Sequence, residues 1–318
     1  MAYSSYNFGV EIETVVRPYA RRPDFTSQQW YKQLAQRLEN RNVPAAPDLQ
    51  SRYCTHPEYY SSKWFITRDG SLTRAHEDFV AMEIVSPVLN TSKGVTKTLS
   101  EFWEAMSVGF EVQKENSCGG HVHVTPANSA KRFTLTELQK CAFAAIVAEN
   151  LVHAILPACR KTNKYCAVNS KSNGGGWART AARGVTSSTI RTAQAQILDA
   201  NSLASLYGYM QGNRYVLWNF ANITPQRAGA SCSGTLEFRG GSQFLDAKTT
   251  LKWIAFVTAF IHLALDENLL NAADFTFVPA TDPGFNAHMS AWWKKIRKSA
   301  AKLKVMRYLP ENWKQMRV

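Results

Sequence analysis

The 318-residue sequence predicts an α+β fold, on three observations. Segments with the alternating pattern of strands and segments with helical apolar spacing come in groups, without the regular strand–helix repeat of parallel α/β proteins. Hydrophobic residues make up 45% and charged residues 19% of the chain, which is typical of a globular protein with a sizeable core. No segment of the chain repeats another. We therefore expect an antiparallel or mixed sheet packed against helices.

The first half of the chain is expected to alternate between strands and helices. The helix prediction is clearest at residues 27–40, where apolar and aromatic side chains recur at helical spacing. A second helix is expected at residues 94–106, and the Pro-, Tyr- and Ser-rich stretch 43–62 is expected to be a loop. The expected strands are residues 6–15, 63–67, 82–85 and 120–125.

The second half contains the longest expected helix, which begins at Thr134 and ends at Pro157. Thr134 and Glu137 have the spacing of a capping box, which marks a helix start. Residues 167–190 are rich in Asn, Ser, Gly and Thr, and we expect either a mobile lid or a plain surface connection there. The remaining expected elements are helices at 203–209 and 247–265 and strands at 215–223 and 234–239.

Basic residues exceed acidic ones, and the excess is concentrated near the C-terminal end. The chain carries 37 Lys and Arg against 24 Asp and Glu, a formal net charge of +13. Residues 292–318 hold nine of the basic residues and one acidic residue, Glu311. A basic balance favours polyanionic partners, but a charge run usually forms a solvated helix face. We therefore expect residues 291–318 to be an amphipathic basic helix or tail packed on the main domain, and no nucleic-acid partner.

The sequence also argues against several classes of protein. No apolar run reaches the roughly 20 residues of a membrane span, and the longest, residues 253–265, contains His262 and is expected to be a buried helix. The N-terminal segment lacks the basic-then-apolar order of a secretory signal. Six cysteines without a CxxC pair do not form a disulfide scaffold or a zinc finger. These features favour a cytoplasmic protein with reduced thiols and no membrane span.

Three of the expected strands carry charged or imidazole side chains two residues apart. The pairs are Glu11 and Glu13, His121 and His123, and Glu237 and Arg239. Residues i and i+2 of a strand share a face, while the residue between them points the other way. Because that middle residue is apolar in each case, each strand offers one polar face and one core face. Glu83 is a fourth acidic strand position, flanked by apolar residues.

Each pair alone is a weak signal of a site, but their joint occurrence favours metal-dependent chemistry. Several carboxylates on one face would repel one another without a cation. Carboxylate oxygens with one imidazole suit Mg²⁺ or Mn²⁺ better than a structural Zn²⁺. An arginine beside a metal-binding carboxylate suits phosphoryl transfer, in which it offsets developing negative charge. A metal-dependent hydrolase that uses the same residues with Zn²⁺ stays an alternative.

With these motifs the chain resembles the amidoligase family, the carboxylate–amine ligases related to glutamine synthetase and glutamate–cysteine ligase. The similar segments run in family order over about residues 6–265. They are FGVEIE at 8–13, RDGS at 68–71, EIVSP at 83–87, CGGHVHV at 118–124, RKTNKYC at 160–166, NRYVLWNF at 213–220 and GTLEFRG at 234–240. The basic tail and residues 20–62 take no part in the resemblance. Substrate specificity is therefore expected in residues 20–62 and 167–190.

The resemblance implies a curved, mainly antiparallel sheet whose concave face binds ATP and divalent metal ions. The resemblance also implies that helices cover the other face of the sheet. It further implies that residues 1–290 form a single catalytic domain. The implied metal ligands are Glu11, Glu13, Glu83, His121 and Glu237. The implied nucleotide-binding residues are His123, Arg239, Asn163 and Asp69, and the implied catalytic residues are Arg239, Arg214 and Glu83.

The resemblance also implies a reaction. ATP and Mg²⁺ (or Mn²⁺) would serve an enzyme that joins a carboxylate to an amine through an acyl phosphate, with amino acids, peptides or amines as small-molecule partners. A kinase on the same scaffold, which stops at the phosphorylated product, is an alternative. An adaptor that acts through the basic tail is another. The sequence does not predict an oligomeric state.

Overall fold

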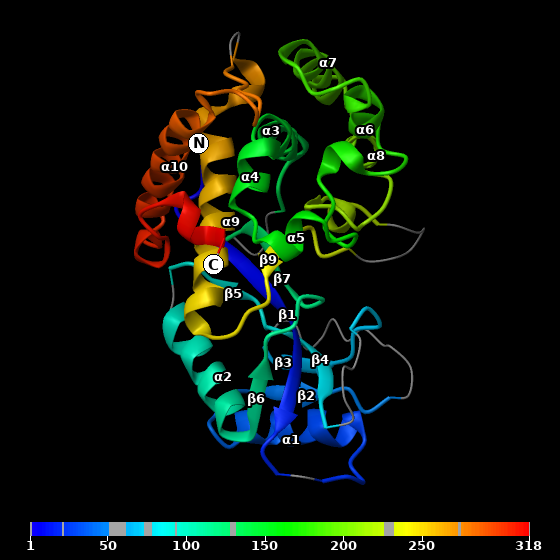
Figure 1. Cartoon of the computed structure of the whole chain (residues 1–318), viewed down its shortest axis with the longest axis vertical. Coiled ribbons are helices and arrows are strands. Elements are labelled where there is room, and N and C mark those ends of the chain that lie inside the picture. The colour runs from blue at the N-terminus through cyan, green and yellow to red at the C-terminus, as the bar shows by residue number, and fades with distance from the viewer. Residues whose placement is uncertain are drawn as a thin grey trace. The chain divides into compact units, whose positions relative to one another are not determined.

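The computed structural model describes residues 2–20, 22–50, 62–72, 78–92, 94–127, 132–225, 232–272 and 275–317. These residues form ten α-helices and nine β-strands, so the chain is α+β as expected (Figure 1). The strands are β1 (Tyr6–Pro18), β2 (Ala45–Pro47), β3 (Trp64–Thr67), β4 (Val80–Val85), β5 (Leu89–Asn90), β6 (Phe110–Gln113), β7 (Gly119–Pro126), β8 (Trp218–Asn219) and β9 (Leu236–Ser242).

The sheet is mixed, and the mainly antiparallel sheet that the resemblance implied is wrong. Its strand order is β2-β3-β4-β1-β7-β9-β8, and β5 and β6 both pair with β1. The β1–β4, β3–β4 and β8–β9 pairs are antiparallel, whereas β2 and β3 are parallel. The connection between β2 and β3 explains the difference, because residues 48–63 are long enough for the crossover that parallel neighbours need.

The helices match most of the expected ones. They are α1 (Ser27–Glu39), α2 (Val95–Gly109), α3 (Leu135–Val147), α4 (Glu149–Ile155), α5 (Ala158–Lys161), α6 (Gly176–Ala181), α7 (Ser187–Leu198), α8 (Leu203–Met210), α9 (Ala247–Glu267) and α10 (Phe285–Lys302). The strand expected at 215–223 shrinks to β8. It ends there because the Asn219 side chain accepts a hydrogen bond from the backbone N–H of Ala221 (2.9 Å) and turns the chain.

The chain divides into two compact units. Unit 1 comprises Met1–Tyr6, His123–Gly240 and Ala255–Val318, and unit 2 comprises Asn7–Val122 and Gly241–Ile254. The basic segment 291–318 belongs to unit 1.

Unit 2 is organised around the β1–β4 pair. The antiparallel register places Ile12 opposite Ile84 and Thr14 opposite Met82, and all four residues are buried. Helix α1 begins at a capping box and packs on β2, β3, β4 and α2 (Figure 1). This face is the apolar core of unit 2, so the alternate residues of β1 and β4 are left for the other face.

Unit 1 contains the helix expected at 134–157, but the helix is broken. The expected capping box is confirmed: the Thr134 side chain accepts from the Glu137 backbone and Glu137 bonds back. The chain then bends by 67° between α3 and α4. Glu149, the first residue of α4, accepts hydrogen bonds from the Ser170 N–H (2.9 Å) and from Trp177 Nε1 (3.4 Å). No Gly or Pro marks the break, so the sequence pattern did not predict it.

The loop expected at 167–190 is present only in part: residues 172–175 and 182–186 are turns or irregular, but the stretch also contains α6 and the first turn of α7. Trp177 of α6 is fully buried, and its indole N–H bonds Glu149. A Cβ on Gly176 would lie 2.4 Å from the Tyr209 ring of α8, so the glycines allow α6 to pack closely. The composition that predicted a loop therefore serves tight helix packing in unit 1.

The environment of Glu149 leads to a prediction about pH. Burial raises the pKa of this carboxyl, and the hydrogen bonds from Ser170 and Trp177 oppose the shift only in part. The pKa of Glu149 is higher in the folded state than in the unfolded state. The free energy of unfolding therefore falls as the pH rises from the unfolded-state pKa to the folded-state pKa. Glu149→Gln should therefore gain stability relative to wild type as the pH rises above the ordinary range of a carboxyl group, measured by urea unfolding. A difference in the free energy of unfolding that does not change with pH would contradict the assignment.

The C-terminal segment packs on unit 1, as expected for an amphipathic helix. The Trp293 ring of α10 stacks on Phe256 of α9, and Lys295 Nζ lies 2.9 Å from Glu267 Oε1. The helix ends at Lys302, ahead of Lys304, whose φ of 61° is left-handed and breaks the helical path.

Among the described residues, one helix, Ala247–Asn271, which contains α9, has the length and composition of a membrane span. The α3–α4 pair would pass as a second only if it formed one span despite its 67° bend. For the first stretch, 72% of the most apolar window is buried inside the protein, as in a core helix.

Candidate functional site

The polar face of unit 2 carries three carboxylates. Glu11 and Glu13 lie two residues apart on β1, on the face opposite buried Ile12. The strand register places Glu83 of β4 directly opposite Glu13. Side chains that are opposite one another on neighbouring strands share a face, with Cβ atoms about 5 Å apart. The three carboxylates therefore gather on one side of unit 2.

His121 of β7 lies against two of them. Its Nδ1 is 2.7 Å from Glu11 Oε2, and its Nε2 is 3.4 Å from Glu13 Oε1. The His121 and Glu13 side chains are 3% and 5% exposed, whereas Glu11 is 24% exposed. The backbone N–H of Gly119 also donates to Glu13 Oε2 at 2.6 Å. We call Glu11, Glu13, Glu83 and His121 the acidic cluster.

The acidic cluster has the donor set of a divalent-cation site. Like charges directly opposite one another destabilise a strand pair. Carboxylate oxygens and an imidazole nitrogen are ligands that Mg²⁺ and Mn²⁺ accept. The residues thus fit the metal ion that the sequence motifs implied.

The glycine before His121 has a packing reason. A Cβ on Gly120 would lie 2.3 Å from the Phe244 ring. On the neighbouring strand, a Cβ on Gly241 would lie 2.4 Å from Gly120 O. These close approaches fix the part of β7 that carries His121.

Gly120→Ala should therefore lower the free energy of unfolding by about 1–3 kcal/mol, the usual effect of overpacking a core. The matched control is Gly208→Ala in α8, where nothing lies within 4 Å of the added methyl. That variant should be neutral or more stable, because alanine favours a helix over glycine. Denaturant unfolding measures both, and equal effects in the two variants would contradict the packing argument.

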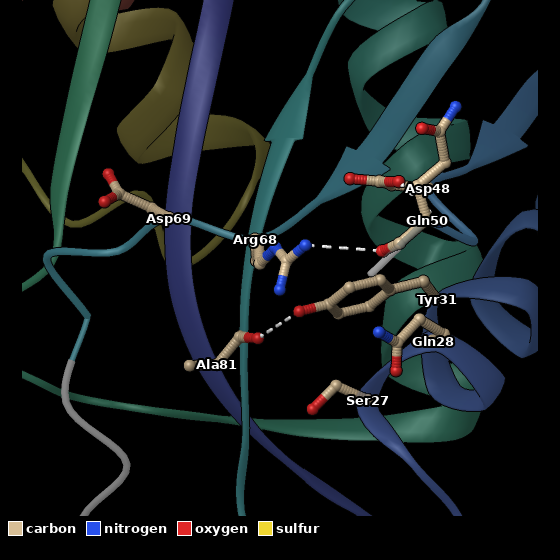
Figure 2. A pocket seen from close by; sticks show the side chains of 8 residues that line it. All are labelled: Ser27, Gln28, Tyr31, Asp48, Gln50, Arg68, Asp69 and Ala81. Carbon is tan, nitrogen blue, oxygen red and sulfur yellow. Dashed lines mark hydrogen bonds between the residues drawn. The ribbon is translucent and has the colours of Figure 1, made fainter. Parts of the chain in front are cut away.

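A cavity of about 230 Å³ lies in unit 2, and Figure 2 shows the residues that line it. They are Ser27, Gln28, Tyr31, Asp48, Gln50, Arg68, Asp69 and Ala81. Burial raises the pKa of Tyr31 to about 12, so its hydroxyl stays protonated and donates to Ala81 O at 3.0 Å. Asp69 is one of the residues predicted from the sequence.

The strand register places the cavity beside the acidic cluster. The Thr67 hydroxyl donates to Asp48 Oδ2 at 2.7 Å, and Thr67 pairs with Glu83 across β3 and β4. Ala81 precedes Glu83 by two residues on β4, so the two side chains share a face about 7 Å apart. Cavity and acidic cluster therefore lie on the same side of unit 2.

A second cluster of charged residues lies in unit 1, on β8 and β9. Glu237 Oε1 accepts from Arg239 Nη1 at 2.5 Å, and Glu237 Oε2 accepts from Asn219 Nδ2 at 2.6 Å. The register places Asn219 directly opposite Glu237. The Glu237 and Arg239 side chains are 3% and 12% exposed. We call these three residues the Glu237 cluster.

Further hydrogen bonds hold Arg239 and Asn219, the two residues that donate to the Glu237 carboxylate. Arg239 Nε donates to Tyr165 O at 3.2 Å, and the buried Arg160 donates to Arg239 O at 2.7 Å. Gln211 Nε2 donates to Asn219 Oδ1 at 2.6 Å. The orientation of the guanidinium and of the amide is therefore set by their surroundings.

His123, on the part of β7 that belongs to unit 1, faces the Glu237 cluster. Its Nε2 is 3.8 Å from Glu237 Oε1. Its Nδ1 is 3.4 Å from Asn222 Nδ2 and 3.2 Å from Thr235 Oγ1. An amide N–H directed at Nδ1 makes that atom the acceptor, so the ring proton of a neutral His123 lies on Nε2, toward the carboxylate.

Two predicted residues stand apart from the clusters. Arg214 is exposed, and its guanidinium lies over the Tyr215 ring, 5.4 Å from the centroid. Asn163 Oδ1 accepts from the Tyr165 N–H at 2.8 Å. Asn163 thus shapes the turn whose carbonyl, on Tyr165, binds Arg239.

Sequence reasoning gave no site role to several residues of these sites. Asp48, Tyr31 and Gln211 were missed, and Arg160 and Asn219 lie in segments of the resemblance but were assigned no role in the site. A polar residue inside the apolar run VLWNF was an available signal for Asn219. For Asp48 the local sequence, PAAPDLQ, is typical of a loop and carried no signal.

Comparison with known proteins gives one match. A family model described as "Putative amidoligase enzyme" matches residues 4–261, a range that includes the acidic cluster, the cavity and the Glu237 cluster. No curated protein matches the chain.

Proposed function

The chain belongs to the amidoligase family, whose model matches most of its length, and from this premise we propose that it is an ATP-dependent carboxylate–amine ligase. Family membership indicates a ligase-type enzyme. The observation that carries the finer proposal is the acidic cluster, in which Glu83 lies opposite Glu13 and His121 contacts Glu11 and Glu13.

The proposed reaction has two steps. A substrate carboxylate oxygen attacks the γ-phosphorus of ATP, an O–P bond forms, and ADP leaves with the bridging oxygen. The amine nitrogen then attacks the acyl carbon, a C–N bond forms, and the C–O bond to phosphate breaks. The amine gives up protons and phosphate leaves, so the amide is lighter by one water than the two substrates together.

The acidic cluster would hold Mg²⁺ or Mn²⁺ through Glu11, Glu13, Glu83 and His121. A bound divalent ion supplies positive charge that neutralises the phosphate oxygens during transfer. Burial of His121 and Glu13, together with the Gly119 N–H on Glu13, keeps these ligands in place before substrate arrives. Such preorganisation lowers the cost of reorganising charge in the transition state.

The Glu237 cluster would act on the transferring phosphoryl group. Arg239 is fixed by Glu237, by Tyr165 O and, through its own carbonyl, by Arg160. A fixed guanidinium offsets the negative charge that builds during phosphoryl transfer. We assign Glu237 to metal binding and His123 to nucleotide binding. The exposed Arg214 is assigned to phosphate, and Asn163 to the turn that orients Arg239.

The test is turnover of the full-length protein with MgATP and a pool of amino acids. We expect ADP, inorganic phosphate and a new mass that equals two substrates minus one water. ADP with a phosphorylated product and no amide would replace the ligase by a kinase. Product formed without ATP would replace it by a hydrolase-type activity.

A further inference from the structure

The cavity of unit 2 is lined by opposite charges that do not pair with one another. In the described part of the chain, the Arg68 guanidinium makes one hydrogen bond, from Nη2 to Gln50 O at 3.3 Å. Asp48 accepts from the Thr67 hydroxyl and from the Gln50 N–H, and Asp69 accepts from the Ser71 N–H at 2.5 Å. Figure 2 shows the Asp69 carboxylate turned away from Arg68.

Among the described residues, hydrogen bonds use less than half of the donors and acceptors of these charged groups. Arginine has five N–H donors in a planar fork, and a carboxylate has about four acceptor positions. The fork matches a carboxylate with two parallel hydrogen bonds. The acceptors of Asp48 and Asp69 match the three N–H bonds of an ammonium group. A molecule that carries both groups complements the cavity.

Net charge and size narrow the class further. Two carboxylates against one guanidinium give the lining a formal charge of −1, which disfavours phosphates and other anions. A volume of about 230 Å³ equals the liquid share of roughly eight water molecules, which suits a molecule with about that number of heavy atoms. Tyr31, protonated at neutral pH, adds an aromatic wall.

We infer that this cavity binds a free amino acid of neutral or positive overall charge, with its carboxylate on Arg68 and its ammonium on Asp48 and Asp69. The inference rests on the proposed function, for which this molecule would be the amine substrate. Its place beside Glu83 puts the amine next to the acidic cluster, within the same unit. The lining comes from α1, from the segments after β2 and β3, and from Ala81 of β4. Five of its eight residues lie in the range 20–62, where specificity is expected.

The test is isothermal titration calorimetry of the full-length protein with glutamine, lysine and glutamate, each with and without a non-hydrolysable MgATP analogue. We expect glutamine and lysine to bind at least tenfold more tightly than glutamate. Arg68→Gln should weaken glutamine binding at least tenfold. Ala81→Leu, which fills the cavity, should abolish it, and thermal unfolding should show that the variant is folded.

Asp69→Asn tests the charge argument directly, because it removes one negative charge from the cavity lining without changing the size of the side chain. It should reduce the ratio of the glutamine affinity to the glutamate affinity. Arg22→Gln, an exposed arginine of unit 2 outside the cavity, is the matched control and should bind like wild type.

Three results would overturn the inference. The first is that none of the three amino acids binds under either condition. The second is that Arg68→Gln, Ala81→Leu and Asp69→Asn all leave the three affinities unchanged. The third is a wild-type preference for glutamate, which contradicts the charge argument. Amino-acid binding that follows these expectations without any ATP turnover would overturn the proposed function and leave the cavity assignment standing.

Discussion

Glu83→Gln should be more stable than wild type in metal-free buffer and yet inactive. In the folded protein Glu83 lies directly opposite Glu13, and removing one of two facing like charges should raise the free energy of unfolding by about 0.2–1 kcal/mol. The same change removes a proposed metal ligand, so Mg²⁺ or Mn²⁺ should no longer raise the melting temperature. Amide formation should fall by on the order of 10²-fold or more. Denaturant unfolding, thermal unfolding with metal and the turnover assay measure the three effects.

The matched control is Glu111→Gln, at a strand position opposite Arg17. There the removed carboxylate faces a guanidinium, so the stability should stay the same or fall, and activity should be unchanged. The acidic cluster would not be a cation site if two results were found together. Glu83→Gln would be less stable than wild type, and Mg²⁺ or Mn²⁺ would still raise its melting temperature.

Arg239→Gln should have the largest effect on stability. It removes the guanidinium that pairs with the buried Glu237 carboxylate, and breaking a buried ion pair from one side costs about 3–5 kcal/mol. The double variant Glu237→Gln with Arg239→Gln should recover much of that loss, because no unpaired charge is left in the core of unit 1. Both variants should lose ATP-dependent turnover. Urea unfolding of the two single variants and the double variant gives the coupling energy.

A structural role alone would predict a different pattern. If the double variant were stable and kept wild-type turnover, the Glu237 cluster would be structural only. If Arg239→Gln were no less stable than Arg17→Gln, an exposed ion-pair arginine, the pair would not carry the energy of a buried one.

The strand predictions succeeded where local pattern decides the structure. In β1 and β9 an apolar residue between two charged ones fixed which face each side chain takes, and the observed strands carry Glu11, Glu13, Glu237 and Arg239 at these positions. The parallel β2–β3 pair was not predictable, because three residues of β2 carry no strand pattern of their own. Its pairing depends on neighbours that are distant in sequence.

The start of helix α6 is a second feature that local sequence did not predict. Residues 173–176, NGGG, are typical of a loop. Residues 173–175 do form a turn, and α6 begins at Gly176. What the composition did not show is that Gly175 and Gly176 lie close to Gln211 and Tyr209 and that Trp177 is buried, because these contacts depend on tertiary packing.

The residues of the candidate site also differ in whether local sequence could predict them. The residues on strands were found from their spacing, whereas Asp48 and Asn219 were not, because their roles come from partners across the sheet. Asp48 depends on Thr67 of β3, and Asn219 depends on Glu237 of β9. No sequence pattern links either residue to its partner.

The fate of one oxygen atom tests the central claim most directly. The full-length protein is supplied with MgATP, an amine substrate and a carboxylate substrate labelled with ¹⁸O in the carboxyl group. An acyl-phosphate ligase transfers one labelled oxygen to inorganic phosphate for each amide formed, because the C–O bond breaks when the amine attacks. We predict singly labelled phosphate in equal amount to the amide. Amide formation with unlabelled phosphate would contradict the proposed mechanism, and labelled oxygen kept on a phosphorylated product would identify a kinase instead.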